Sequence, residues 1–165
     1  MKKYTFLFLS LVYLTMSCSG SKSVTMNNTS KTPFVWEGAN VYFLLTDRFY
    51  NGDTSNDVNF NRTKTPGKLR GFEGGDIIGI TKKIESGYFE KLGINAIWLT
   101  PIVEQIQDGV DEGTGLSYGY HGYWAKDWTA LDPNFGTKED LAKLVKKAHE
   151  KGIRIILDGV INHTG

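Results

Sequence analysis

Three polar residues follow a short apolar run near the end of the chain, and they are the first candidates for chemistry. The run at residues 153–157 is rich in β-branched side chains and predicts a strand that is buried on both faces. Asp158 ends this strand, and Asn162 and His163 follow in the next loop. Ligands of parallel α/β proteins bind at the carboxyl ends of the strands. We therefore expect these three side chains at a binding edge.

A second candidate segment is rich in glycine and in aromatic residues. Within eleven residues it contains Tyr118, Tyr120, His121, Tyr123, Trp124 and Trp128. Sugars present flat C–H faces that stack on such rings, and their hydroxyls need polar partners such as His and Asp. A sugar site is therefore favoured, and a small satellite core under a long loop is the alternative. Zinc has less support, because the sequence has no His-x-x-x-His pair and no cysteine cluster.

The first long loop is crowded with oxygen-bearing groups. They are Asn51, Asp53, Asn56 and Asp57, with Gly74, Gly75 and Asp76 at the far end of the loop. Carboxylate, amide and carbonyl oxygens are the ligands that Ca²⁺ takes, about six to eight at a time. The loop is not an EF-hand, because Arg62 and Lys64 stand where the bidentate Glu is needed. Such residues also make turns, so a calcium site and a plain turn-rich loop both stay open.

The elements that position these residues alternate between strand and helix. Apolar runs predict strands at residues 41–45, 94–100 and 153–157. One helix is expected from Thr81 to Gly93, and a second from a Thr137–Asp140 capping box to Gly152. This β-α-β-α-β order predicts a parallel sheet with right-handed crossovers.

The lengths of the connections narrow the fold class. Both long loops leave the carboxyl edge of the predicted sheet, and the returns at the other edge are tight, which is typical of a (β/α)8 barrel. Neither G-x-G-x-x-G nor a Walker motif follows a strand, so nucleotide binding has no support. We predict an α/β fold that comprises the first three strands and two helices of a (β/α)8 TIM barrel. The barrel is incomplete, and its outer strands lack neighbours.

The N-terminal residues predict export. Residues 1–17 resemble a signal peptide, with Lys2 and Lys3 before an apolar segment too short to span a bilayer comfortably. Cys18, the sole cysteine, follows Ser17 as in a lipoprotein cleavage site, so we expect lipidation at Cys18 and anchoring to a membrane, either periplasmic or at the cell surface. Plain secretion is the next alternative, and an uncleaved anchor is the last. Residues 18–36 are then a flexible tether, and residues 37–165 are the folded domain.

Net charge bears on the class of partner. The formal net charge is +1, which provides no electrostatic support for nucleic-acid binding. We therefore expect no nucleic acid among the partners.

Four segments carry a family resemblance. Residues 158–163 (DGVINH) resemble the first signature region of the α-amylase superfamily (glycoside hydrolase family 13), and residues 93–101 (GINAIWLTP) resemble its second barrel strand. Residues 120–124 (YHGYW) resemble the loop that shapes the sugar subsite at the cleavage point. The first loop, from TDRF at residues 46–49 to GGD at residues 74–76, is similar to that of bacterial cyclodextrin glucanotransferases and related amylases. The likeness covers roughly residues 40–165, the N-terminal part of the family's barrel.

This resemblance implies roles for individual residues. Tyr123 would stack on the glucose ring at the cleavage subsite, and His121 and His163 would hydrogen-bond its hydroxyls. Asp158 would fix the geometry of its loop. Asn162 would ligate a calcium ion shared with an inserted domain after the third strand. The ligands of a second calcium, found in some members, would be Asn51, Asp53, Asn56, Asp57, the Gly74 carbonyl and Asp76.

The resemblance assigns no catalytic residue to this chain. The family's mechanism is retaining, with a carboxylate nucleophile and a carboxylic acid. In family members these groups and a third carboxylate follow the fourth, fifth and seventh strands, which are not among the three predicted here.

We therefore predict an N-terminal fragment of an exported enzyme, inactive and poorly soluble alone, that acts on α-1,4-linked glucan (starch, maltodextrin or cyclodextrin) with Ca²⁺ as cofactor. One alternative is a non-catalytic, calcium-dependent glucan-binding surface lipoprotein. The other is a small complete α/β domain with an unrelated ligand.

Overall fold

A three-stranded parallel sheet is the central element of the fold. The computed structural model describes residues 33–63 and 65–165, so the predicted signal peptide and Cys18 lie outside the described residues. The strand order is β1 (Val41–Leu44), β2 (Ala96–Leu99) and β7 (Arg154–Leu157). Tyr42 lies opposite Ile97, which in turn lies opposite Ile155. The three predicted strands and their parallel direction are confirmed, each with slightly narrower bounds.

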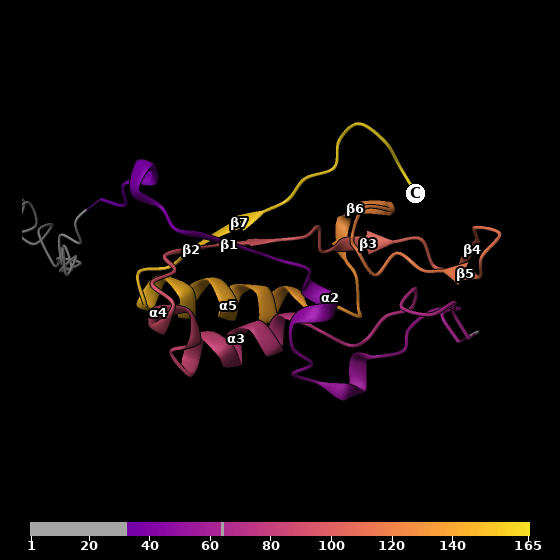
Figure 1. The fold of residues 1–165 in the computed structure, drawn as a ribbon, viewed down its shortest axis with the longest axis horizontal. Coiled ribbons are helices and arrows are strands. Elements are labelled where there is room, and N and C mark those ends of the chain that lie inside the picture. Colours follow the sequence, from indigo (N-terminus) through magenta and orange to yellow (C-terminus); the bar gives the residue numbers. More distant parts are fainter. Residues whose placement is uncertain (1–32, 64) are drawn as a thin grey trace, which may run out of the picture. The chain divides into compact units, whose positions relative to one another are not determined.

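Three helices cover one face of this sheet (Figure 1): α3 (Ile77–Glu85), α4 (Tyr88–Lys91) and α5 (Lys138–Glu150). The buried side chains between the helices and the sheet are mostly branched aliphatic, with two phenylalanines: Leu44, Ile77, Ile80, Ile84, Phe89, Ile97, Leu99, Phe135, Leu144 and Ile153. Burying one such side chain stabilises the fold by about 1.5–3 kcal/mol. This core therefore holds α3 and α5 against the sheet and sets the positions of the loops at its carboxyl edge.

The first helix differs from the prediction. It begins at Ile77, because the Asp76 carboxylate caps it by accepting a hydrogen bond from Gly79 N at 2.5 Å. Thr81 lies inside the helix, where its hydroxyl donates to Ile77 O at 2.9 Å. The predicted single helix is also broken after Glu85, because Gly87 adopts a left-handed backbone with φ 74° before α4 begins.

The second helix follows the prediction. Thr137 and Asp140 form the expected capping box at the start of α5. Gly152, which follows its end, has φ 74°, the left-handed conformation that ends many helices.

The other face of the sheet is open, so the expectation that the strands are buried on both faces is wrong. Phe43 and Trp98 lie side by side on this face, with ring centroids 5.1 Å apart. They are 52% and 39% exposed, because the three helices all lie on the opposite face. In this sheet β1 and β7 are both edge strands.

The two long loops contain short elements that the sequence did not predict. The first loop includes α2 (Thr46–Phe49) and the turn η2 (Thr54–Asn56), and the turn η1 (Trp36–Gly38) precedes β1. In the second loop, β3 (Val103–Gln105) pairs antiparallel with β6 (Ala125–Leu131), and β4 (Val110–Asp111) pairs with β5 (Leu116–Ser117). These two small sheets lie beyond the carboxyl ends of β1, β2 and β7 (Figure 1). No helix in residues 33–63 and 65–165 is long and apolar enough to cross a membrane.

Candidate functional site

The three residues predicted to bind sugar come together at the carboxyl edge of the sheet. His121 and Tyr123 lie between β5 and β6, and their rings stack with centroids 6.0 Å apart and an interplanar angle of 18°. His163 lies after β7, and its Nε2 donates to Tyr123 O at 2.9 Å. The Tyr123 hydroxyl donates to Asp158 Oδ2 at 3.0 Å. The structure thus brings the three side chains together, while their binding roles stay a prediction.

A tight turn sets the directions of His121 and Tyr123. Tyr123 N donates to His121 Nδ1 at 3.0 Å, which fixes the imidazole against the backbone. Gly122 between them has φ 88°, and a Cβ at this position would overlap the Pro101 carbonyl. Only glycine therefore lets the turn lie this close to the end of β2.

Both rings are held in their uncharged forms. Burial lowers the pKa of His121 from its ordinary value, and the nearby Arg48 charge adds to this effect, while Glu112 opposes it. Burial raises the pKa of Tyr123, and its hydrogen bond to Asp158 raises it further. Near neutral pH the site therefore presents a neutral imidazole and a neutral phenol, which suit an uncharged hydroxylated ligand.

A hollow of about 240 Å³ lies beside His121. Its lining combines aromatic and polar side chains: Arg70, Glu112, Ser117, Tyr120, His121 and Trp124. Arg70 pairs with Glu112 at 2.7 Å, and the Arg48 guanidinium lies 4.0 Å from the centre of the Tyr120 ring. This hollow therefore offers ring faces next to hydrogen-bonding groups, the combination that sugars require.

The first loop gathers the predicted calcium ligands in two groups. In the first group, Asn51 Nδ2 donates to Asp57 Oδ1 at 2.8 Å. Gly74 lies against both side chains, since a Cβ at this position would overlap Asn51 and Asp57. Asp47 holds the Gly74 turn by accepting hydrogen bonds from Glu73 N at 3.0 Å and Gly74 N at 3.3 Å. Burial raises the pKa of Asp47 to about 6, although these N–H groups and a neighbouring arginine oppose the shift.

The second group surrounds Asp76. Its carboxylate accepts hydrogen bonds from Gly52 N at 3.2 Å and Asp53 N at 2.8 Å, and Asn56 Nδ2 lies 3.4 Å from Oδ2. The Asp53 carboxylate caps η2 by accepting from Ser55 N at 3.0 Å. Asp76 therefore joins the loop to the start of α3. The Asp53 carboxylate, in contrast, accepts its hydrogen bonds within the turn η2.

Two buried amide oxygens in this loop, Asn51 Oδ1 and Asn56 Oδ1, accept no hydrogen bond. Buried acceptors without a partner are uncommon and costly, and a bound cation satisfies them. Together with the carboxylates and the Gly74 carbonyl they form a set of hard oxygen donors that fits Ca²⁺. In the described part of the chain no group of three or more His, Cys, Asp or Glu side chains is placed to hold a metal ion. A cation here would thus depend on amide and backbone oxygens as well as carboxylates.

Asn162 stands in a different place. It lies in the exposed segment after β7, and its Nδ2 is 2.6 Å from His163 Nδ1. It was predicted to ligate a separate calcium shared with another domain, and that role stays a prediction.

Sequence reasoning missed a buried ion pair that joins the two long loops. The Arg62 guanidinium donates to both oxygens of Asp132, at 2.7 and 2.6 Å, and the two side chains are 2% and 0% exposed. Asn134 accepts a further hydrogen bond from Arg62. We refer to Arg62, Asp132 and Asn134 as the buried clamp. Its sequence signal is weak, because Arg62 lies in a polar loop and Asp132-Pro-Asn134 has the composition of a turn.

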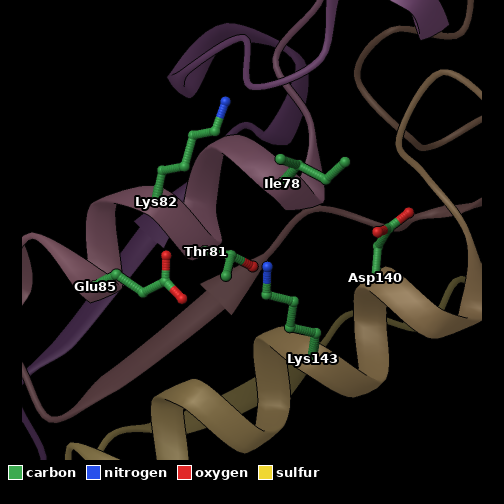
Figure 2. A pocket seen from close by; sticks show the side chains of 6 residues that line it. All are labelled: Ile78, Thr81, Lys82, Glu85, Asp140 and Lys143. Atoms are coloured by element: carbon green, nitrogen blue, oxygen red, sulfur yellow. The ribbon is translucent and has the colours of Figure 1, made fainter.

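A smaller pocket of about 90 Å³ lies between α3 and α5 (Figure 2). Its lining is mixed in charge and includes Ile78, Thr81, Lys82, Glu85, Asp140 and Lys143. It is formed by the helices that cover the sheet, not by the loops at the carboxyl edge, and it is much smaller than ordinary ligand sites. We assign no function to this pocket.

The fold and the loops place the chain among α/β proteins that bind ligands at the carboxyl ends of parallel strands. Residues 43–165 match the family described as alpha amylase, catalytic domain. The chain belongs to this α-amylase family, and the resemblance noted from its motifs is confirmed.

Amylases and cyclomaltodextrin glucanotransferases are among the similar proteins. The chain is 48% identical over 140 residues to the periplasmic alpha-amylase of Escherichia coli (strain K12), which covers 82% of this chain and 20% of that protein. It is 42% identical over 127 residues to the cyclomaltodextrin glucanotransferase of Geobacillus stearothermophilus, and this match covers 75% of the chain and 17% of that protein. The chain thus spans about a fifth of the length of these curated relatives.

Solved structures agree with this placement. A cyclomaltodextrin glucanotransferase with a three-domain ABC distribution superposes with a TM-score of 0.66 at 44% identity, over 75% of this chain and 26% of that one. The alpha-amylase from Geobacillus thermoleovorans, complexed with acarbose, gives a TM-score of 0.62 at 41% identity, over 81% and 25%. The described residues therefore correspond to about a quarter of each of these chains.

Proposed function

We propose that the chain is the N-terminal part of an exported glycoside hydrolase or transglycosylase that acts on α-glucans. The observation that carries this proposal is the grouping of His121, Tyr123 and His163 at one strand edge in a member of the α-amylase family. Because the relatives are named as amylases and cyclomaltodextrin glucanotransferases, the proposed ligands are starch, maltodextrin or cyclodextrin.

The geometry supports a division of labour among the site residues. The Tyr123 ring offers a face for a glucose unit, and Asp158 holds its hydroxyl at 3.0 Å, so the ring direction is set before a ligand arrives. His121 and His163 supply hydrogen-bonding ring nitrogens. The hollow lined by Tyr120 and Trp124 extends the contact surface to the next unit of a chain.

The catalytic carboxylates are proposed to lie in further βα units of the same barrel. Support comes from the open face of the sheet, where Phe43 and Trp98 are half exposed, and from the unpaired edges of β1 and β7. Additional strands next to these edges would close the barrel over the aromatic face. The described residues then bind and orient the sugar, while the other units supply the nucleophile and the acid.

Calcium and export are further parts of the proposal. Asn51, Asn56, Asp57, Asp76 and the Gly74 carbonyl would hold Ca²⁺ in the first loop, with Asp53 joining them, and the ion would supply a fixed positive charge that orders the loop. Signal-peptide cleavage before Cys18 and lipidation of Cys18 would anchor the chain to a membrane. The similarity to a periplasmic amylase supports export.

Affinity electrophoresis of the 165-residue chain in gels that contain soluble starch tests this proposal. We expect retardation that Tyr123→Ala abolishes, and no retardation by a β-linked glucan such as hydroxyethylcellulose. Trp36→Ala, which removes an exposed aromatic before β1, is the matched control and leaves the retardation unchanged. Absence of retardation, or equal retardation of Tyr123→Ala, contradicts the sugar site. Release of reducing ends from starch by this chain contradicts the placement of the carboxylates elsewhere.

A further inference from the structure

The buried clamp reaches the proposed calcium loop through Asn134. Its Nδ2 donates to Asn56 O at 3.0 Å and to Asp57 O at 2.7 Å. These carbonyls belong to the backbone of two proposed calcium ligands. Asn134 is 1% exposed, so no bulk water replaces its hydrogen bonds. The amide therefore fixes the backbone that carries the side-chain ligands.

The same clamp reaches the sugar-facing segment through Gln105. Asp132 Oδ2 accepts a hydrogen bond from Gln105 N at 2.9 Å. The Gln105 side chain is fully buried, and its Oε1 accepts from Trp124 N at 2.7 Å. Trp124 directly follows Tyr123. Hydrogen bonds thus lead from the calcium loop through the clamp and Gln105 to the backbone of Trp124, the residue after the tyrosine proposed to stack on sugar.

We propose that Arg62, Asp132, Asn134 and Gln105 couple cation binding in the first loop to the geometry of the sugar-facing segment 121–124. Asn134 is a positioning residue for the calcium ligands, and Gln105 is a positioning residue for the turn that carries Tyr123. This inference rests on the proposed function and adds regulation to it. Through this coupling, bound Ca²⁺ raises the affinity for glucan. Because coupling between two sites is reciprocal, bound glucan raises the affinity for Ca²⁺ by the same factor.

A merely structural role for these residues makes a different prediction. In that case their replacement lowers the stability of the whole domain but leaves Ca²⁺ affinity and glucan affinity independent of each other. Positioning requires that a change at Asn134, which is not itself a proposed calcium ligand, alters the affinity for the ion. Loss of an outer-shell partner typically weakens metal binding by about 10–100-fold.

Calcium titration calorimetry of the 165-residue chain provides the first measurement. We expect Asn134→Ala to raise the Kd for Ca²⁺ by about 10–100-fold. Asn40→Ala is the matched control, because Asn40 Nδ2 also donates to a backbone carbonyl, that of Gly93 at 3.1 Å, but at the amino ends of the strands. Asn40→Ala should leave the Kd unchanged. If Asn134→Ala does not fold, Asn134→Ser replaces it, because serine also lacks the amide NH₂ group but keeps a hydroxyl oxygen that can accept a hydrogen bond from Arg62.

Hydrogen–deuterium exchange of residues 121–128 provides the second measurement. Addition of Ca²⁺ should slow exchange in this segment of the unaltered chain, and Gln105→Ala should abolish that response while the ion still binds. An unchanged Kd in both Asn134 variants, or an exchange response that survives in Gln105→Ala, overturns the coupling. An unaltered chain that binds no Ca²⁺ also overturns it.

The starch retardation assay separates this inference from the proposed function. Retardation that does not depend on Ca²⁺ leaves the sugar site standing and removes the coupling. If the Asn134 variants weaken Ca²⁺ binding but starch does not retard the chain, the sugar site of the proposed function is refuted. The clamp then positions the metal loop in a chain that binds no glucan.

Discussion

Replacement of Asp132 by Asn is the sharpest test of the buried clamp as a source of stability. The side chain keeps its shape, but it loses its charge and one of its two acceptor oxygens. Asp132 accepts hydrogen bonds from Arg62 at 2.7 and 2.6 Å, from Gln105 N at 2.9 Å and from Asn134 N at 3.0 Å. An amide cannot accept all four, because its NH₂ group then faces an N–H donor.

The size of the effect follows from the burial of the pair. The Arg62 side chain is 2% exposed and that of Asp132 is 0% exposed, so the guanidinium in the variant has neither water nor a carboxylate to offset its charge. Removal of one partner of such a pair costs about 3–5 kcal/mol. Small domains are stable by about 5–15 kcal/mol in total. The variant should therefore lose a large part of its stability.

Urea denaturation of the 165-residue chain, followed by far-ultraviolet circular dichroism, measures this loss. A loss of about 3–5 kcal/mol at a slope of about 1–3 kcal/mol per molar urea should lower the midpoint by about 1–5 M. Asp127→Asn on β6 is the matched control, since Asp127 accepts hydrogen bonds only locally, from Thr129 N and Oγ1 at 2.7 Å, and it should keep the midpoint. The double variant Arg62→Met with Asp132→Leu should recover most of the lost stability. Equal midpoints for the two Asp→Asn variants would refute the burial argument.

Three other substitutions probe the cap, the metal loop and the imidazole. Thr137→Ala removes the Oγ1 acceptor for Asp140 N at 3.1 Å and should lower the free energy of unfolding by about 1 kcal/mol in urea titrations. Gly74→Ala places a methyl group among the ligands at φ 88° and should weaken Ca²⁺ binding by about tenfold or more in calorimetry, whereas Gly38→Ala, which meets open space, should not. Burial holds the pKa of His121 below 6.5, so the unfolded chain takes up the proton first as pH falls. The stability contributed by the neutral ring is thus complete above 6.5 and is lost as pH falls below that value through the folded pKa. His121→Gln should flatten this dependence in urea midpoints measured from pH 5 to pH 8; an unchanged slope would contradict the burial of the ring.

The parallel sheet was predictable because strong local patterns specify it. The runs that became β1, β2 and β7 are short and mostly apolar, and the Thr137–Asp140 cap defines the start of α5 by local hydrogen bonds alone. The break at Gly87 was not predictable from the same patterns. The apolar stripe of Ile84 and Tyr88 continues at helical spacing across the break, so periodicity conceals it.

The candidate site likewise has residues that the sequence predicts and residues that it does not. His121, Tyr123 and His163 were predictable because a shared strand edge and aromatic composition point to one place. The buried clamp was not, since its partners are far apart in sequence: Arg62 and Asp132 are 70 residues apart. Their pairing depends on how the two long loops pack, and no local pattern encodes that packing. Burial on both faces of the strands was also mispredicted, because an apolar strand sequence does not show which elements cover each face.

The shared carboxylate of Asp76 has a consequence for mutational tolerance. One side chain both begins α3, through Gly79 N, and gathers the first loop, through the N–H groups of Gly52 and Asp53. A glutamate is one methylene too long for the helix cap, and an asparagine replaces one acceptor oxygen by a donor. Saturation mutagenesis should therefore find position 76 nearly invariant. Position 53, whose carboxylate accepts hydrogen bonds within one exposed turn and would add one calcium ligand, accepts serine or asparagine with weaker binding of Ca²⁺. Differences in the affinity of the loop for cations would then come from substitutions at the neighbouring ligand positions, such as 53, while Asp76 itself stays unchanged.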